Sequence, residues 1–390
     1  MAVWRFAPPV RRALLIQALF SFGLWGVGST VMNLYLHRAG IANDVIGYAN
    51  AMPAVAAMLI GLPVATASDR YGRRPFLVFG TLVAALGTAA LAFSTTTLPL
   101  LASALLMGIG TSCIFAVDAA VLADHSTDED RLAVFSSNFL LGWVGAFCGS
   151  VAGGYLATAI GGEVGLRAAL LLGAAVVGLA SIPALLLPRP QRRVAMPVSQ
   201  GLLSRDLLKF AVPNLVLAFG AGAMVRFFNL FFAVKFSLDP GTIGAILASS
   251  YVVTAGAALL APAIARRVGS VNFLIASVSL SIPFLVVITY TPWLAPVVIA
   301  FLARQGLMNM GEPVYQAFAQ GTVAPERRGA LNGMFALSWN VGWLAGPAVS
   351  GILQVRGGFE LAFSFTIVCY LVYIPLLWWF WVRPGRTRES

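Results

Sequence analysis

The chain has 390 residues, of which 59% are hydrophobic and only 10% charged, and its formal net charge is +11. Ordinary soluble domains carry roughly 25% charged residues, so this composition excludes a soluble protein and indicates an integral membrane protein. The three cysteines stand singly, which excludes a zinc motif or a disulfide framework.

A membrane-spanning helix needs about 20 apolar residues. Twelve stretches meet this length, at 11–36, 44–67, 76–95, 98–123, 133–160, 166–187, 207–235, 240–264, 271–290, 293–322, 328–354 and 358–382. No remaining segment is long enough for a second, water-soluble domain. The sequence therefore predicts an all-α membrane protein with twelve transmembrane helices.

The basic residues fall mainly on one side of these spans. With the N-terminus placed in the cytoplasm, 19 of the 25 lysines and arginines lie in cytoplasmic segments and four in outer segments. This asymmetry follows the positive-inside rule, so we expect a multi-pass protein of the plasma (inner) membrane with both termini cytoplasmic. The positive charge then faces anionic lipid, and no nucleic-acid partner is expected.

A charged loop, Ser-Asp-Arg-Tyr-Gly-Arg-Arg-Pro at 68–75, joins the second and third spans. It resembles the loop signature of the major facilitator superfamily, G-x-L-a-D-R-x-G-R-R. The positions that match are Asp69, Arg70, Gly72, Arg73 and Arg74, whereas the opening Gly and Leu are alanines here. The resemblance implies that Asp69 helps to lock two helix bundles together on the cytoplasmic side.

The chain matches itself at a constant offset of 197 residues. Phe22-Gly23 falls on Phe219-Gly220, and Gly149 falls on Gly346. Each copy has an even number of spans, so the two copies have the same orientation in the membrane. We expect an N-terminal six-helix bundle at 1–187, a cytoplasmic linker at 188–206 and a C-terminal bundle at 207–390. The family resemblance implies that the two bundles rock about a central site.

The cytoplasmic loops are expected to form a gate. Asp69 and Asp124 stand at the inner ends of two spans, near several arginines. The repeat carries Arg266 in place of Asp69, so the acidic part occurs in one copy only. The alternative is a set of simple positive-inside charges. The expected gate residues are Asp69, Arg70, Gly72, Arg73, Arg74, Asp124, Arg131 and Arg328.

Two carboxylates at membrane depth, Asp118 and Glu312, are the candidate proton carriers. Charged groups there are costly and usually face a cavity or each other. Glu312 lies in Met-Gly-Glu-Pro, where Gly311 and Pro313 allow the helix to bend and admit water. Such a carboxyl can bind and release a proton; the alternative is one satisfied by neighbouring helices. An acid at this level also resembles bacterial multidrug/proton antiporters.

Two arginines, Arg226 and Arg304, also lie within spans. Arg226 sits in an aromatic stretch and could neutralise an anionic substrate, or it could pair with a carboxylate or reach the outer interface. Arg304 could serve the substrate, or it could be held by polar neighbours such as Asn309. Other residues that could line a cavity are Gln17, Phe20, Trp25, Asn33, Tyr35, Asn138, Trp143, Phe227, Asn229, Tyr315, Gln316, Trp339 and Asn340.

The fifth span carries small residues at 145, 149, 153 and 154, with Ser150 after the second glycine. The pattern is similar to G-x-x-x-G-P-x-x-G-G of the antiporter branch, except that Ser150 replaces proline. Small residues one turn apart also allow close helix packing without any meaning for antiport. Both interpretations stay open at this point.

The sequence favours a secondary active transporter, which expels lipophilic, cationic compounds in exchange for protons at Glu312 and Asp118. The alternatives are a proton-coupled carrier of organic anions, a lipid or lysolipid flippase, and a receptor that transports nothing. No P-loop or metal cluster is present, so an enzyme is not expected. We expect no cofactor, the proton gradient as energy source, and a monomer whose partners are its small-molecule substrate, protons and membrane lipids.

Overall fold

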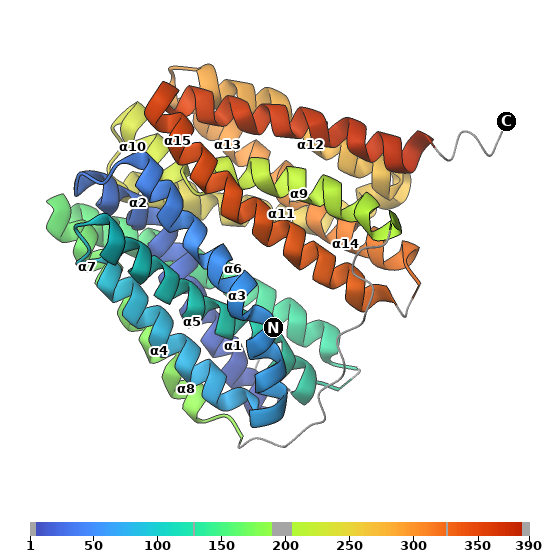
Figure 1. Ribbon diagram of the computed structural model, residues 1–390, viewed down its shortest axis with the longest axis horizontal. Coiled ribbons are helices and arrows are strands. Elements are labelled where there is room, and N and C mark those ends of the chain that lie inside the picture. The colour runs from blue at the N-terminus through green and yellow to red at the C-terminus, as the bar shows by residue number, and fades with distance from the viewer. Residues whose placement is uncertain (1–4, 128, 189–204, 325–326, 384–390) are drawn as a thin grey trace. The chain divides into compact units, whose positions relative to one another are not determined.

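The computed structural model describes residues 5–127, 129–188, 205–324 and 327–383, and these form helices joined by short loops. The chain divides into two compact units (Figure 1). The first consists of Met1–Met196 with Phe227–Tyr251, and the second of Pro197–Arg226 with Val252–Ser390. Residues 227–251 belong to the second copy of the sequence repeat but pack with the first.

The first unit contains all helices of the first repeat. Its first span is continuous but changes character, because a π-helical stretch separates two α-helices within it. The elements are α1 (Pro8–Phe20), η2 (Ser21–Gly28), α2 (Ser29–Arg38), α3 (Asn43–Tyr71), α4 (Arg73–Leu91), α5 (Thr97–His125), α6 (Arg131–Ile160), α7 (Gly162–Leu179), α8 (Ser181–Leu185), α10 (Phe228–Phe236) and the beginning of α11 (Pro240–Val268).

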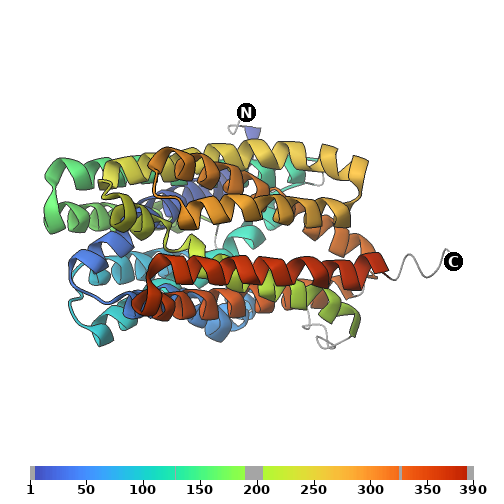
Figure 2. The same ribbon diagram turned by 90° about the horizontal axis from the view of Figure 1, so that it is seen from above.

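Helix α5 packs along α3 and α4, while α6 packs along η2 and α7 (Figures 1 and 2). Glycine makes the α6–η2 contact possible. A Cβ on Gly149 would lie 2.1 Å from the carbonyl oxygen of Phe22, which is closer than atoms approach. Small residues at such a crossing let the backbones touch, as expected for helices in lipid.

The same helix, α6, also contacts the beginning of α11. A Cβ on Gly154 would lie 2.4 Å from the Pro240 carbonyl oxygen, and one on Gly244 would lie 2.4 Å from the Ser150 carbonyl oxygen. Ser150, which replaces the proline of the antiporter pattern, donates its hydroxyl to the Gly26 carbonyl at 3.2 Å. The small residues of α6 therefore serve packing on two sides.

The second unit contains most of the second repeat. Its elements are α9 (Arg205–Val225), the remainder of α11, α12 (Ser270–Tyr290), α13 (Leu294–Asn309), α14 (Gly311–Thr322), α15 (Arg328–Leu377) and the π-helical η4 (Trp378–Val382). Packing here repeats that of the first unit. A Cβ on Gly346 would lie 2.6 Å from the Phe219 carbonyl oxygen, and both residues lie 197 positions after Gly149 and Phe22.

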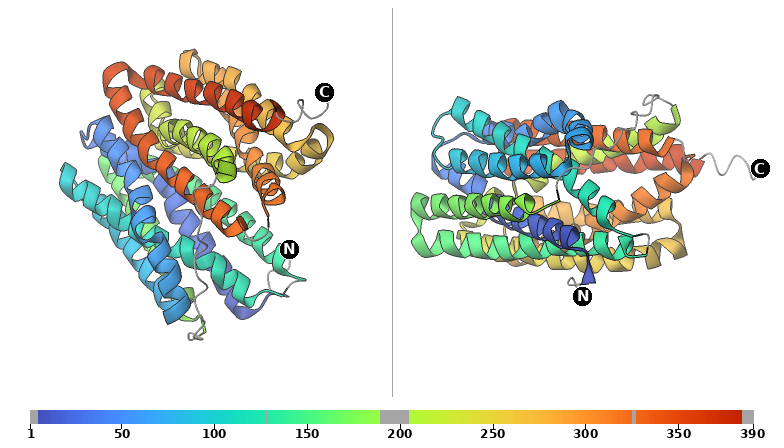
Figure 3. Two further views of the ribbon diagram at one scale, coloured as in Figure 1. Left: turned by 45° about the vertical axis from the view of Figure 1, so that its right-hand side comes forward. Right: turned by 90° about the horizontal axis from the view of Figure 1, so that it is seen from below.

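Helix α15 is two membrane spans joined by a sharp turn. Gly357 and Gly358 have non-helical backbone angles, and Gly358 has a φ of +67°. At this turn the chain doubles back, and the two parts of α15 diverge from it (Figures 1 and 3). The described residues contain 11 helices long and apolar enough to cross a membrane, of which the last, Arg328–Val382, has 55 residues. Divided at the turn, they give the twelve predicted spans.

Candidate functional site

The four charged residues predicted at membrane depth are divided between the units. Asp118 lies in α5 of the first unit, whereas Arg226, Arg304 and Glu312 belong to the second. Their surroundings differ, because each arginine lies over an aromatic ring and each carboxylate meets an amide. These contacts decide which charges remain available for chemistry.

Asp118 is buried, with 5% of its surface exposed, on the side of α5 that carries Val117 and Val121. The amide of Asn138, on α6, donates from Nδ2 to Asp118 Oδ2 at 3.2 Å. Asp118 Oδ1 and Asn138 Oδ1 are both buried, and neither has a hydrogen-bond partner among the residues the structure describes. Asn138, predicted to line a cavity, is therefore the direct neighbour of the candidate proton carrier.

Glu312 lies at a break in the tenth span. The chain leaves the helix at Met310, between α13 and α14, where the sequence predicts a bend beside Gly311 and Pro313. Its side chain is exposed, and Gln316 donates from Nε2 to Glu312 Oε1 at 3.0 Å.

Two buried tyrosines lie within electrostatic reach of Glu312. They are Tyr315 on α14 and Tyr373 on α15. The hydroxyl of Tyr315 donates to the Phe210 carbonyl at 2.7 Å. Glu312 thus combines a broken helix, an exposed carboxylate and neighbouring phenols.

Arg304 is the largest side chain buried in the described structure, with 2% exposed. Its guanidinium donates to the hydroxyl of Tyr370 at 2.7 Å and to Gln305 Oε1, and it lies 5.9 Å from the Tyr370 ring centre. The amide of Asn309, named above as a possible neighbour, instead donates to the Gln305 carbonyl at 2.8 Å. Hydrogen bonds and an aromatic ring thus surround the charge.

Arg226 follows the end of α9, and the chain leaves the helix at Arg226 and Phe227 before α10 begins. This break could not be predicted from the sequence, because neither of the two residues at the break is glycine or proline. The guanidinium lies 4.7 Å from the ring centre of Trp343 on α15, a cation–π contact. Trp343 in turn packs against Trp339, which was predicted to line the cavity.

Three buried asparagines connect α2, α3 and α10. Asn50 donates to Asn33 Oδ1 at 2.9 Å, and Asn33 donates to Asn229 Oδ1 at 3.2 Å. Asn229 donates to the Thr30 carbonyl at 3.1 Å. Asn33 and Asn229 are predicted cavity residues, and each has 2% of its surface exposed. These asparagines lie near those ends of their helices that are predicted from the sequence to face the outside.

The remaining candidates for lining a cavity make contacts within their own unit. The Tyr35 hydroxyl donates to the Ala92 carbonyl at 2.6 Å, and the Trp25 carbonyl accepts from the Tyr251 hydroxyl at 2.8 Å. Gln17 donates to the Ser21 hydroxyl at 3.2 Å, and Asn340 donates to a carbonyl of its own helix. Of the aromatic candidates, Phe20 packs against Phe115 and Trp143 packs against Tyr251, and Phe227 is buried.

At the outer end, Asp239 precedes α11 and joins it to α6. It accepts hydrogen bonds from the Thr242 hydroxyl at 2.5 Å and from the Thr158 hydroxyl at 2.9 Å. The bond from Thr242, followed by that from Thr158 and by the backbone N–H groups of α11, lowers the pKa of Asp239 to about 2. Asp239 is not among the functional residues predicted from the sequence.

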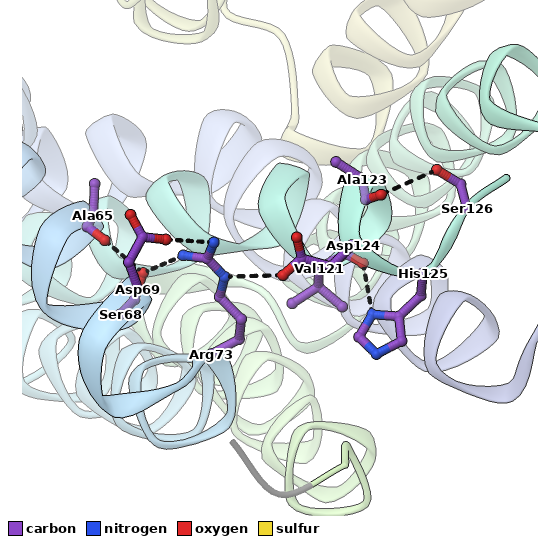
Figure 4. A network of polar contacts seen from close by, with 9 residues as sticks. All are labelled: Ala65, Ser68, Asp69, Arg73, Val121, Ala123, Asp124, His125 and Ser126. Carbon is purple, nitrogen blue, oxygen red and sulfur yellow. Dashed lines mark hydrogen bonds and ion pairs between the residues drawn. The ribbon is translucent and has the colours of Figure 1, made fainter. Parts of the chain in front are cut away.

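The predicted cytoplasmic gate centres on Arg73 (Figure 4). Its guanidinium contacts Asp69 at 2.5 Å and Asp124 at 3.5 Å, and it donates to the Ser68 hydroxyl at 2.7 Å. Gly72 has a φ of +92° between α3 and α4, an angle that favours glycine. Both acidic residues of the expected gate thus meet one arginine.

The other four gate candidates have different surroundings. Arg70 lies over the ring of Tyr71 at 5.4 Å, and Arg74 borders an apolar hollow with Val78 and Phe79. Arg131 begins α6, and Arg328, in the second unit, donates from Nε to the Gln320 carbonyl at 3.1 Å. No group of three His, Cys, Asp or Glu side chains suited to a metal occurs among the described residues.

Comparison with known proteins gives one family. The sequence model described as Major Facilitator Superfamily matches residues 13–234 and 211–390. The chain is 27% identical to the tetracycline resistance protein, class C, of Escherichia coli, over 88% of each chain. It is 26% identical to multidrug resistance protein 1 of Bacillus subtilis (strain 168), over 93% of each chain. The crystal structure of the nucleoside transporter NupG has a TM-score of 0.75 at 17% identity, covering 95% of this chain and 98% of that one, which supports the fold alone.

Proposed function

Because the chain belongs to the major facilitator superfamily, a family of transporters and not of enzymes, we propose that it exports lipophilic cations in exchange for protons. The observation that carries the proposal is the difference between acidic and basic groups at membrane depth. Neither Asp118 nor Glu312 forms an ion pair with any described residue, whereas Arg226 and Arg304 lie over aromatic rings. A carboxylate at membrane depth without a counter-charge favours binding a cation or a proton.

Glu312 is the better site for exchange. It lies where the helix breaks, so water and substrate can reach a carboxylate held by a single amide. A cation and a proton compete for the same carboxylate, and this competition makes the exchange obligatory when the site alternates between the two sides. Relatives named for tetracycline and multidrug resistance support efflux as the direction.

The organic-anion alternative requires Arg226 or Arg304 to bind the anion beside its aromatic partner. Arg304 is held in place, because its guanidinium is buried and donates to Tyr370. We therefore favour cations over anions. We further propose that the protein works as a monomer without a cofactor in the plasma (inner) membrane, with both termini cytoplasmic, as the 19 basic residues on that side favour.

Equilibrium binding of tetraphenylphosphonium, a lipophilic cation, tests the shared carboxylate. The protein is placed in lipid nanodiscs, and affinity is measured as a function of pH. If one proton must leave for each cation bound, the affinity rises about tenfold per pH unit over the range in which the carboxyl is protonated.

Glu312→Gln should abolish this dependence on pH, whereas Glu360→Gln, an exposed glutamate at the beginning of the last span, should leave it unchanged. Affinity that does not vary with pH in the wild-type protein would contradict the proposal. Tight binding of small carboxylates that Arg226→Gln or Arg304→Gln removes would favour the anion carrier.

A further inference from the structure

Asp118 and Asn138 form only half of the hydrogen bonds that their side chains can share. A carboxylic acid and a primary amide can meet edge to edge and form two hydrogen bonds at once. The structure shows one of these, from Asn138 Nδ2 to Asp118 Oδ2 at 3.2 Å. The two oxygens without a partner, Asp118 Oδ1 and Asn138 Oδ1, are the atoms that the second bond would join.

The number of protons decides whether the second bond forms. An ionised carboxylate can only accept, so Asp118 Oδ1 and Asn138 Oδ1 are then both acceptors, and neither can supply a donor to the other. One proton on Asp118 Oδ1 supplies the missing donor and satisfies both buried atoms. A buried polar atom without a partner costs about 1–3 kcal/mol, so this geometry favours the protonated acid.

We propose that Asn138 is the positioning residue of a proton switch at Asp118. In the protonated state, Asp118 donates its O–H to Asn138 Oδ1 while it accepts from Asn138 Nδ2, and two hydrogen bonds tie α5 to α6. When the O–H bond breaks, its electron pair stays on the carboxylate and the proton passes to water. The second hydrogen bond is then lost.

No charged neighbour competes for this role in the described part of the chain. Asp118 has no ion pair, and Asn138 is its one hydrogen-bonding partner there. The helices that pack against α5 are α1, α3, α4 and α6. Their charged residues stand in the end turns, and the titratable groups of these helices and of α5 are Arg11, Arg12, Asp44, Asp69, Arg70, Arg73, Arg74, Arg131, Asp124, His125, Tyr48, Tyr71, Tyr155, Cys113 and Cys148.

The tie has a mechanical consequence because α6 is one continuous helix. Ser150 and Gly154, which contact the beginning of α11, follow Asn138 on α6 by 12 and 16 residues. At 1.5 Å per residue, the proton site and this contact are about 18–24 Å apart on one rigid element. Loss of the second hydrogen bond leaves a single bond between α5 and α6 at the other end of this helix, so the proton state of Asp118 biases the contact with α11.

Infrared spectroscopy of the full protein in lipid tests the pair directly. Spectra recorded at stepwise pH values are subtracted from one another, and the difference shows the bands of carboxyl groups that gain or lose a proton. The band that is missing in Asp118→Asn is assigned to Asp118. In the wild-type protein, we expect this carbonyl band at the lower wavenumber of an acid that accepts a hydrogen bond. In Asn138→Leu it should move to higher wavenumber, and Asn138→Gln should restore it in part.

Asn138→Ala is measured beside Asn138→Leu, so that a folding failure of one leaves the other. Asn272→Leu removes an exposed amide at the beginning of α12, which donates to the carbonyl of Val268 at the end of α11, and it should leave the band in place. A band that stays in place in both Asn138 variants would overturn the proposal. So would the absence of an Asp118 band across the pH range in which the protein stays folded.

The inference rests on the proposed function only for the use of the proton in transport, and the two fail separately. If the infrared bands shift as expected but the affinity for tetraphenylphosphonium does not vary with pH, the Asp118–Asn138 pair is supported and the antiporter is refuted. Binding that depends on pH through Glu312, without an Asp118 acid band, would refute the pair and leave the antiporter standing.

Discussion

The amide of Asn229 offers a direct measure of how strongly α10 is held to the first repeat. Its Oδ1 accepts from Asn33 Nδ2 at 3.2 Å and from the Leu230 N–H at 2.8 Å, and its Nδ2 donates to the Thr30 carbonyl at 3.1 Å. Asn229→Leu keeps a similar volume and removes all three hydrogen bonds. We therefore expect a lower free energy of unfolding.

The expected magnitude follows from the number of bonds. Each buried hydrogen bond contributes about 1 kcal/mol net, and the added apolar surface of leucine offsets part of the loss, so Asn229→Leu should cost about 1–3 kcal/mol. Asn33→Leu removes the bond to Asn229 and the bond from Asn50. Since the two variants share one bond, the double variant should lose about 1 kcal/mol less than the sum of the single variants.

Denaturant titration in mixed micelles, followed by circular dichroism, gives the free energies for the four proteins. Asn272→Leu is the matched control, because its amide is exposed and makes one hydrogen bond, to the Val268 carbonyl four residues earlier, and it should change stability by less than about 0.5 kcal/mol. The reasoning is refuted if Asn229→Leu costs no more than this control. Losses for Asn33 and Asn229 that add within about 0.3 kcal/mol would refute it as well.

Three further changes test other contacts. Gly149→Val places a side chain against backbone, so the thermal midpoint in detergent should fall by the equivalent of at least about 1–3 kcal/mol, whereas Gly256→Val meets open space and should fold normally. The pKa of Asp239 is lowered to about 2, so its contribution to stability is present above its ordinary value of 3.8 and is lost as the pH falls toward 2. Asp239→Asn should therefore remove this loss of stability at acid pH from the thermal unfolding curves. The same loss in the variant would count against the assignment. Arg73→Met should cost about 1–3 kcal/mol in low salt and less in high salt, with Arg73→Lys in between, and equal losses at all salt concentrations would contradict an electrostatic network.

Features set by local chemistry could be predicted from the sequence. Gly72 ends α3 at a positive φ, and the tenth span breaks beside Gly311 and Pro313, as these residue types favour. The repeat at offset 197 follows equivalent packing, since Gly149 and Gly346 contact the carbonyls of Phe22 and Phe219. These positions could be predicted because glycine takes a positive φ at low cost and because proline removes a hydrogen bond of the helix.

Features set by helix rotation could not be predicted. A span surrounded by lipid and other helices is apolar on most of its circumference, so periodicity does not show which side faces a neighbour. Sequence named Asn138 but not its contact with Asp118, and it did not find Tyr370 beside Arg304 or Trp343 beside Arg226. The only available signal for Tyr370 was its spacing of three residues from Tyr373 on one helix face.

The exchange of a cation for a proton is best tested in proteoliposomes that contain a pH-sensitive dye and an acidic lumen. Tetraphenylphosphonium added outside should drive protons out of the lumen through the wild-type protein. Glu312→Gln should abolish this flux, and Glu360→Gln should match the wild type. Proton movement that persists in Glu312→Gln would contradict exchange at this carboxylate. A wild-type protein that moves protons only with small carboxylates would contradict cation efflux altogether.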